Sequence, residues 1–383
     1  MSGSGEYSWV IKNVTLDGNS PNVPEPGADD AANGAPYNPL VQHMGIYVVG
    51  LGAAGWAGTV TIDNVRFRNF HGNNIRYLGA AAQNNGIGAN AANSPWARCI
   101  IRNVDIDGGY NGIHGDRGRG LVIEGGIIRN TEANGILRTL TRGDKVTGVT
   151  IDRPGMDGIV GTYTLDEQII GCHVTEAGES GFVGGGGNGG VVIFQGATWV
   201  GNTATDCEWH GFVIDPILSA PAGDGQTHAV ASTISACQAR NNKYHGIYIN
   251  GCSQVSVVGC SATGAPTGYS GLAILGYRVT VDGGTYTGNA TGVALQGDKA
   301  PTNGMTGYGF HKIDVAVYGN VKDWQFGSGI NSGAVGTVLT FVTKASPQGA
   351  IFAPRGSTST DALTGIIYRK TTDASSNTGW VTP

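Results

Sequence analysis

The sequence predicts an all-β chain folded as a right-handed parallel β-helix, and three observations support this prediction. A three-residue motif, made of a polar residue, glycine and an apolar residue, recurs with its glycines 23 residues apart, at positions 112, 135, 158 and 181. The motif recurs again at glycines 211, 246, 271 and 292, at intervals of 30, 35, 25 and 21 residues. Short runs rich in Val and Ile separate the motifs, and no stretch has the apolar spacing of a helix. This period suits stacked coils of three short strands.

The repeat predicts where the strands lie in the sequence, and it defines one column of side chains that point into the core. The Val- and Ile-rich runs at 121–123, 146–151, 169–170, 191–193, 255–258 and 279–281 are expected strands. Glycine before the apolar residue suits a turn with positive φ or a close approach of the next coil. We expect residues 1–330 to form a β-helix of about 9 to 11 rungs, and residues 331–383 to form a small β-rich module. The residues after the repeat glycines should stack inward: Ile113, Ile136, Ile159, Phe182, Phe212, Ile247, Leu272 and Val293.

Composition excludes several other classes of protein. Of the 383 residues, 66 are Gly, 40% are hydrophobic and 13% are charged. Without a Gly-x-y period the chain is not a collagen, and its apolar content is too high for a disordered chain. The net charge of −5 disfavours nucleic acid as a partner, and no apolar run is long enough for membrane insertion. The first residues do not resemble a signal peptide, and rung-like sequence begins at Trp9, so we expect upstream sequence to be missing.

The six cysteines are expected to be free thiols that pack as small hydrophobic residues. Cys172 and Cys237 each precede their repeat glycine by nine residues, which is a repeated column position. A disulfide framework does not suit a chain of this length and glycine content. Neither the cysteines nor the eight histidines have the spacing of metal ligands, so no metal and no cofactor are predicted.

Where the period lengthens, the additional residues must leave the rungs as loops. Residues 184–190 and 215–228 are two such segments, and longer insertions at 19–42 and 78–94 precede the regular repeat. Loops on a rigid scaffold are where function concentrates. These insertions are expected to form the walls of a groove along the solenoid, and a long groove is a shape suited to binding a polymer.

Unusual side chains occupy the rungs beside these insertions. Two residues before the repeat glycine, successive rungs carry Trp209, Tyr244 and Tyr269. Because stacked rungs lie about 4.8 Å apart, these rings are expected to form an outward ladder suited to the apolar faces of sugars. The next position carries His210 and His245. The alternative is a polar turn ladder with aromatic stacking that only stiffens the solenoid.

Candidate catalytic residues gather on the same rung. Glycoside hydrolysis commonly uses two carboxyl groups, about 5 Å apart for retention or about 6.5–9.5 Å for inversion. Glu208 and Asp215 are the leading acid/base candidates, with His210 assisting, and Asp157 lies two rungs earlier. The alternative for each carboxylate is an ordinary solvated position.

Two further groups extend this hypothesis. Arg138 and Arg142 lie one rung before Asp157 and could bind a substrate carboxylate through paired N–H donors. A lyase would instead need a base such as His210 or His245 beside a cation that stabilises an enolate-like anion.

The alternation of Val- and Ile-rich strands with Asn-Gly turns over residues 7–330 resembles the pectin-lyase-like right-handed β-helix superfamily. That superfamily contains polysaccharide lyases, glycoside hydrolases, C5-epimerases and phage tailspikes. The lyase signature does not transfer, because Arg153-Pro154 lacks the second arginine of the pectate lyase motif. The epimerase run Asp-Pro-His-Glu does not transfer either, because Asp215-Pro216 continues with Ile217-Leu218. No Asp-Asp pair sits in a polygalacturonase context.

The C-terminus resembles a short module found at the ends of phage tail fibres and tailspikes. It contains, in order, Ser346-Pro347-Gln348-Gly349, Ala353-Pro354-Arg355-Gly356-Ser357, Ile367-Tyr368-Arg369-Lys370 and Asn377-Thr378-Gly379-Trp380. The usual Gly-Ser-Leu-Tyr is replaced by Gly356-Ser357-Thr358-Ser359. The resemblance implies a homotrimeric virion tail protein, outside the cell but made in the host cytoplasm without a signal peptide. It also implies contacts with other tail proteins through the missing upstream part.

These expectations combine into one functional hypothesis with alternatives. The chain is expected to be a tailspike-like depolymerase that binds and cleaves a bacterial capsule, exopolysaccharide or O-antigen, by hydrolysis in preference to β-elimination. The predicted binding residues are Trp209, Tyr244, Tyr269, His245 and Arg138. The alternatives are a non-catalytic phage adhesin, or a bacterial polysaccharide lyase or epimerase.

Overall fold

The computed structural model describes residues 7–19, 44–49, 58–78, 98–185, 194–215, 228–277, 279–295, 312–326, 338–343, 357–361, 364–372 and 378–382. Every regular element in these ranges is a β-strand, as predicted. The chain divides into two compact units, residues 1–183 and 184–383. Within the described ranges, no helix is long and apolar enough to cross a membrane. The predicted boundary near residue 330 stays a prediction.

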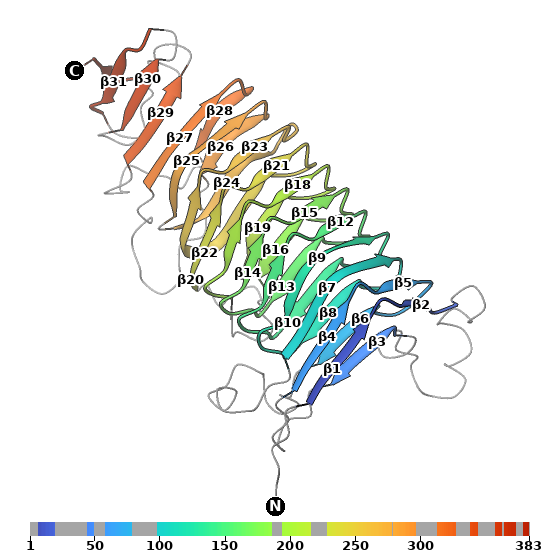
Figure 1. Cartoon of the computed structure of the whole chain (residues 1–383). Helices are drawn as coiled ribbons and strands as arrows, with labels where there is room; N and C mark the ends of the chain where they lie inside the picture. Colours follow the sequence, from blue (N-terminus) through green and yellow to red (C-terminus); the bar gives the residue numbers. More distant parts are fainter. Residues whose placement is uncertain are drawn as a thin grey trace, which may run out of the picture. The chain divides into compact units, whose positions relative to one another are not determined.

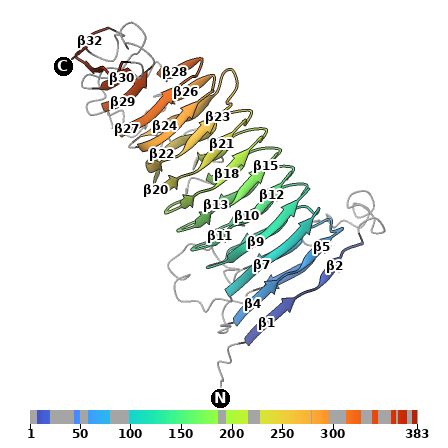
Figure 2. The same ribbon diagram turned by 45° about the horizontal axis from the view of Figure 1, so that its top comes forward.

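The first unit is built from three parallel ladders of short strands, which Figures 1 and 2 show in blue to green. The strands are β1 (Tyr7–Lys12), β2 (Thr15–Asp17), β3 (Ile46–Val49), β4 (Gly58–Asp63), β5 (Arg66–Arg68), β6 (Ile75–Leu78), β7 (Arg98–Asp107), β8 (Ile113–Asp116), β9 (Val122–Arg129), β10 (Ile136–Thr139), β11 (Lys145–Thr147), β12 (Thr150–Asp152), β13 (Ile159–Thr162), β14 (Gln168–Ile170) and β15 (His173–Thr175). One ladder runs β1-β4-β7-β9-β11-β14 and a second runs β2-β5-β7-β9-β12-β15. The third runs β3-β6-β8-β10-β13, and its strands from β8 onward begin directly after a repeat glycine.

The second unit repeats this plan. Its strands are β17 (Thr198–Val200), β18 (Thr203–Thr205), β19 (Phe212–Asp215), β20 (His228–Ser235), β21 (Gln238–Arg240), β22 (Ile247–Val258), β23 (Ser261–Thr263), β24 (Ser270–Tyr277), β25 (Thr280–Thr287), β26 (Thr291–Leu295), β27 (Lys312–Tyr318), β28 (Lys322–Phe326), β29 (Val338–Thr343), β30 (Thr358–Asp361), β31 (Ile367–Lys370) and β32 (Trp380–Val381), with β16 (Phe182–Gly185) at the division between the units. The ladder that carries the candidate site runs β19-β22-β24-β26-β28, all parallel. Only β30, β31 and β32 pair antiparallel among the described strand pairs.

The predicted inward column is confirmed. Ile113, Ile136 and Ile159 lie opposite one another in β8, β10 and β13, and Phe212, Ile247 and Leu272 do so in β19, β22 and β24. All eight members of the column are completely buried. Since each side chain packs on its counterparts in neighbouring rungs, the column forms the apolar core of each unit.

The repeat glycines are required by close packing and not by backbone conformation. Gly112, Gly135 and Gly158 do not have positive φ. A Cβ atom at Gly112 would lie 2.6 Å from the carbonyl oxygen of Gly135, and one at Gly135 would lie 2.8 Å from that of Gly158. Of the two predicted reasons for glycine, close approach of the next coil is therefore the correct one.

The cysteine prediction is also confirmed, since all six cysteines are free and buried. The predicted loops at 19–42, 78–94, 184–190 and 215–228 lie almost entirely outside the described residues. So do the first two motifs of the C-terminal module. In its last two motifs, Lys370 pairs with Trp380 across antiparallel strands, and the Lys370 ammonium lies 5.7 Å from the centre of the Trp380 ring.

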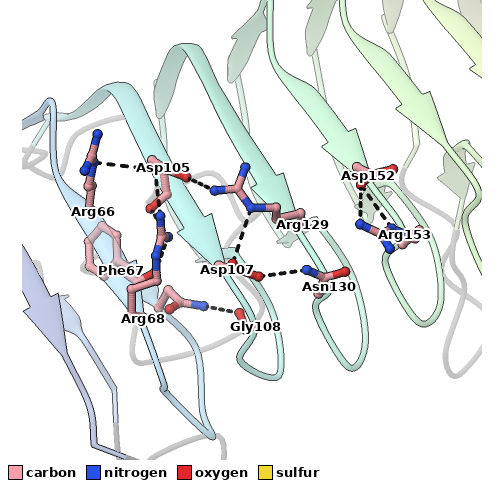
Figure 3. Close-up of polar contacts among 11 residues, drawn as sticks. Arg66, Phe67, Arg68, Asp105, Asp107, Gly108, Arg129, Asn130, Asp152 and Arg153 are labelled. Carbon is pink, nitrogen blue, oxygen red and sulfur yellow. Dashed lines mark hydrogen bonds and ion pairs between the residues drawn. The ribbon is translucent and has the colours of Figure 1, made fainter.

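An ion-pair network covers the outer face of β5, β7 and β9, and a separate ion pair between Asp152 and Arg153 lies at the end of β12 (Figure 3). Asp105 accepts hydrogen bonds from Arg68 and Arg129, both at 2.7 Å, and lies 3.6 Å from Arg66. These residues belong to neighbouring rungs and are partly exposed, so the network ties rung to rung at the surface.

The inward column predicts a large stability cost for one truncation. Ile136→Ala should lower the free energy of unfolding by about 2–5 kcal/mol, because it leaves a cavity between two packed rungs. Ile127→Ala is the matched control, because Ile127 lies on β9 of the same unit with 43% of its surface exposed, and it should change stability by about 0.5 kcal/mol. Denaturant unfolding of both variants measures the difference. Equal losses would contradict the assignment of the column as the core.

Candidate functional site

The residue before each repeat glycine links its rung to the next. We call this set the turn row. In the first unit, Asn111 Oδ1 accepts the backbone N–H of Asn134 at 3.0 Å, and Asn134 Oδ1 accepts that of Asp157 at 3.3 Å. Asp157 Oδ1 accepts the backbone N–H of Ser180 at 2.8 Å. Asn111, Asn134 and Asp157 therefore each satisfy a backbone donor of the following rung.

In the second unit, histidines take the same position and make the same bond. His210 Nδ1 accepts the backbone N–H of His245 at 3.2 Å, and His245 Nδ1 accepts that of Ser270 at 3.0 Å. An Nδ1 atom that accepts a hydrogen bond carries no proton, so the neutral ring must carry its proton on Nε2. The backbone thus fixes both rings as Nε2–H donors.

The two histidine rings lie in a stack with a tyrosine that sequence analysis did not identify. The rings of His210 and His245 are parallel within 3° with centroids 5.3 Å apart. The Tyr248 ring is parallel to both, 4.7 Å from His210 and 5.3 Å from His245. Tyr248 follows the inward residue Ile247, so strand alternation alone points it outward and was the available signal. These three rings form one cluster of nearly parallel, mutually stacked rings.

The predicted aromatic ladder is present. Trp209 and Tyr244 have ring centroids 6.0 Å apart, and Tyr244 and Tyr269 have centroids 4.3 Å apart. We call these three residues the aromatic column. The Tyr244 backbone N–H donates to the Trp209 carbonyl at 2.9 Å, so the rung spacing itself sets the stacking distance. Trp209 has 44% of its surface exposed, which leaves ring area for a ligand.

The two leading carboxylates lie in different environments. Asp215, at the end of β19, is buried and accepts a hydrogen bond from Asn250 Nδ2 at 2.8 Å. Glu208 is exposed and lies 2.5 and 2.6 Å from the Lys243 ammonium through its two oxygens. Asp215 follows Val213 by two residues and Val213 lies opposite Tyr248, so Asp215 faces the same side of the ladder as the Tyr248 ring.

Burial makes both histidines weak bases. It lowers the pKa of His210 to about 3, with a further contribution from the neighbouring His245 charge. Burial lowers the pKa of His245 to about 4. Because Nδ1 is already bonded to a backbone donor in each ring, neither histidine presents a lone pair to a substrate proton. This arrangement suits hydrogen-bond donation and does not suit the general base that β-elimination requires.

Arg138 does not join this surface. Its guanidinium is completely buried inside the first unit, where Nη1 lies 2.8 Å from Glu167 Oε2. Thr164 donates to the same Glu167 oxygen at 2.8 Å. The residues opposite Arg138 on the neighbouring rungs are Gly115 and Gly161, which leave room for the long side chain. Arg138 therefore takes a core position, and we leave it out of the binding site proposed below.

The earlier carboxylates are also engaged within the first unit. Asp157 belongs to the turn row, and burial raises its pKa to about 7. Asp166 forms an exposed ion pair with Arg142 at 3.0 Å. Among the residues that the structure describes, no group of three or more His, Cys, Asp or Glu side chains could hold a metal ion.

The sequence matches the model of the right-handed β-helix region over residues 45–215 and 224–303, which is more than half of the chain. The chain therefore belongs to the right-handed β-helix family, and the handedness predicted from the sequence is confirmed. No curated protein matches its sequence.

Three solved structures are similar to this chain at low identity. The Dettilon tailspike protein is 16% identical, with a TM-score of 0.44 over 96% of this chain and 69% of the tailspike chain. The receptor-binding domain of the siphovirus 9NA tailspike is 12% identical, with a TM-score of 0.37 over 96% of this chain and 80% of that one. The receptor-binding protein of bacteriophage Det7, a podoviral tailspike in a myovirus, is 11% identical, with a TM-score of 0.37 over 90% and 71%.

The histidine geometry predicts a specific pH dependence of stability. The pKa of His245 falls from 6.5 to about 4 on folding, so the unfolded chain binds more protons between these two values. Stability should therefore fall as the pH drops from about 6.5 toward 4, and His245→Asn should reduce this fall. Asparagine is a matched replacement because Asn111 and Asn134 make the same turn-row bond. Unfolding at pH 7.5 and 4.5 measures the effect; an unchanged fall in stability in His245→Asn would contradict a lowered pKa of His245 in the folded protein.

Proposed function

We propose that the second unit binds a bacterial surface polysaccharide along the aromatic column, and that the protein is a tailspike-like depolymerase. The observation that carries this proposal is the continuity of three kinds of group on adjacent rungs of one ladder. The stacked rings, of which Trp209 is exposed, suit sugar faces, the fixed Nε2–H groups suit sugar hydroxyls, and Asp215 with Asn250 supplies a carboxylate and an amide.

Hydrolysis is the reaction that this chemistry favours. In glycoside hydrolysis one carboxyl group protonates the leaving oxygen, while a second attacks the anomeric carbon or activates a water. We assign Asp215 as the leading acid/base residue and Glu208 as the candidate for the second carboxyl group. His210 and His245 would hold the substrate through hydrogen bonds. Elimination is disfavoured because the Nδ1 atoms of both histidines are occupied.

A second function, a non-catalytic adhesin, is supported by one specific contact. Glu208 is bound through both oxygens to Lys243, and a surface that needs only to bind a glycan has no need for a second available carboxylate. The two functions share the aromatic column and differ only in whether glycosidic bonds are broken.

The wider role follows from the C-terminal resemblance and the fold family. We propose a virion tail location, a homotrimer and attachment to other tail proteins. Lys370 and Trp380, which belong to the quoted motifs, contact each other, and this supports their role as paired structural residues of the terminal module. Light scattering of the purified protein would measure the oligomeric state.

We predict that removing a ring from the aromatic column weakens polysaccharide binding, and that removing an exposed tyrosine outside the column does not. Trp209→Ala and Tyr269→Ala should each weaken polysaccharide binding by about 1–2 kcal/mol, because each removes one stacking ring. Tyr318→Ala is the control, since Tyr318 is 41% exposed and lies on β27, outside the column. Calorimetric titration with capsules and O-antigens from candidate hosts measures affinity. If all three variants bind like the parent protein, the column only stiffens the solenoid.

The proposed acid/base residue predicts a loss of rate without a loss of binding. Asp215→Asn should reduce depolymerisation about 10² to 10⁴-fold while it keeps an acceptor for Asn250. Asp314→Asn, an exposed carboxylate on β27, should have no effect. New reducing ends without absorbance from an unsaturated sugar identify hydrolysis, and both signals together identify a lyase. Full activity in Asp215→Asn would remove this residue from the mechanism, and binding without either signal would establish the adhesin.

A further inference from the structure

Three consecutive rungs of the first unit have the same length and the same kind of apolar core. They span residues 112–134, 135–157 and 158–180, which are 23 residues each. Their inward residues on the three ladders are all Ile or Val and are completely buried: Ile113, Ile123 and Ile128, then Ile136, Val146 and Ile151, then Ile159, Ile169 and Val174. If one rung were left out, these columns would still match residue for residue. The apolar core alone therefore does not determine which rung stacks on which.

Three other buried positions differ between these rungs. They lie at the end of the third-ladder strand and at the corner that follows it. The middle rung carries an arginine, a threonine and an aspartate there, while the rung before it is apolar and the rung after it carries a glutamate. In chain order the residues are Gly115, Gly118 and Leu121, then Arg138, Thr141 and Asp144, then Gly161, Thr164 and Glu167.

An ion pair at these positions joins the middle rung to the next one. Arg138 Nη1 lies 2.8 Å from Glu167 Oε2, and both side chains are completely buried. Glycine at 161 leaves space for the pair, because a Cβ atom there would lie 3.2 Å from Arg138 Nη2 and 2.5 Å from Glu167 Oε2. On the other side, Gly115 separates Arg138 from Tyr77, which is also completely buried. Large side chains and glycines therefore alternate along this row.

A wrong stacking order would break this arrangement. Without the rung at 112–134, Arg138 would lie opposite Tyr77, and two large side chains would compete for one space. Without the middle rung, Glu167 would be buried beside Leu121 with no arginine opposite it. A buried charge without a partner is costly, so both alternatives are disfavoured although their apolar columns match.

We propose that the Arg138–Glu167 ion pair is a register lock, which selects one stacking order among rungs whose apolar cores are interchangeable. Its net contribution to stability is small, because burial removes the hydration of both ions, and apolar side chains of similar volume often stabilise a core at least as well. The Nε and Nη2 atoms of Arg138 are buried without a hydrogen-bond partner, which also favours a role in specificity over one in stability. The lock lies within the first unit and does not depend on the proposed polysaccharide binding.

Two pairs of introduced cysteines report the stacking order after refolding of the full chain. Glu124 and Ile170 lie on either side of Thr147 in the first ladder. They are two rungs apart, about 9.6 Å, which is too far for a disulfide. Glu124→Cys with Ile170→Cys therefore cross-links only when the middle rung is left out, and Glu124→Cys with Thr147→Cys cross-links in the native order. The six native cysteines are buried and do not compete.

The test removes both charges of the lock and compares cross-linking with the parent protein. The parent should give the native cross-link and little of the skipped one. In Arg138→Met/Glu167→Leu, the share of molecules with the skipped cross-link should rise about tenfold, because the cost of an unpaired buried charge no longer opposes the wrong order. The molecules that fold in the native order should unfold at the same denaturant concentration as the parent, or at a higher one.

An exposed ion pair between the same two rungs provides the matched control. Arg142 and Asp166 lie 3.0 Å apart with side chains 54% and 55% exposed, so Arg142→Met/Asp166→Leu should refold like the parent. Arg138→Met alone should unfold at a lower denaturant concentration than the double variant, since it leaves Glu167 buried without its arginine. If Arg138→Met/Glu167→Leu refolds with no more of the skipped cross-link than the parent, the proposal is overturned. Failure of this variant to fold at all also overturns it, because the pair would then be required for stability.

Discussion

Everything described here depends on how closely successive rungs approach at the repeat glycine. A side-chain carbon at Gly112, Gly135 or Gly158 would lie within 2.5 to 2.8 Å of the carbonyl oxygen of the next glycine. Glycine therefore lets neighbouring rungs hydrogen-bond at this corner, where the Ile113 N–H donates to the Gly135 carbonyl at 3.0 Å. The residue after the glycine is thereby turned into the core, and the residue before it is turned toward the backbone of the following rung. Core and candidate site are two consequences of one close contact.

The period alone was sufficient to predict the fold, the inward column and the stacking of Trp209 on Tyr244. These features repeat from one rung to the next, so the spacing of the residues in the sequence is enough to predict them. The interior position of Arg138 was not predictable from the period, because inward residues of a solenoid are apolar as a rule. The signal was the pair of glycines opposite it, Gly115 and Gly161, and it becomes readable only once the register is known.

The alignment of Tyr47, Arg76 and His114 on three successive rungs was not predicted from the sequence for a different reason. Tyr47 and Arg76 are separated from each other and from His114 by intervals of 29 and 38 residues, outside the regular period. Long insertions interrupt the first rungs, so a fixed residue interval does not show which outward side chains lie opposite one another there. The tautomers of His210 and His245 were equally hidden, because they depend on which backbone N–H each ring meets.

The turn row has a consequence for how such a protein can change over time. Asn, Asp and His all supply an acceptor to the same backbone donor at this position, so the fold accepts any of them. The rest of the side chain differs in chemistry: an amide, a carboxylate or an imidazole. The polar group at this position can therefore change in one coil at a time by single substitutions that leave the architecture intact. The hydrogen bond that holds the rungs together and the identity of the polar side chain can therefore change separately.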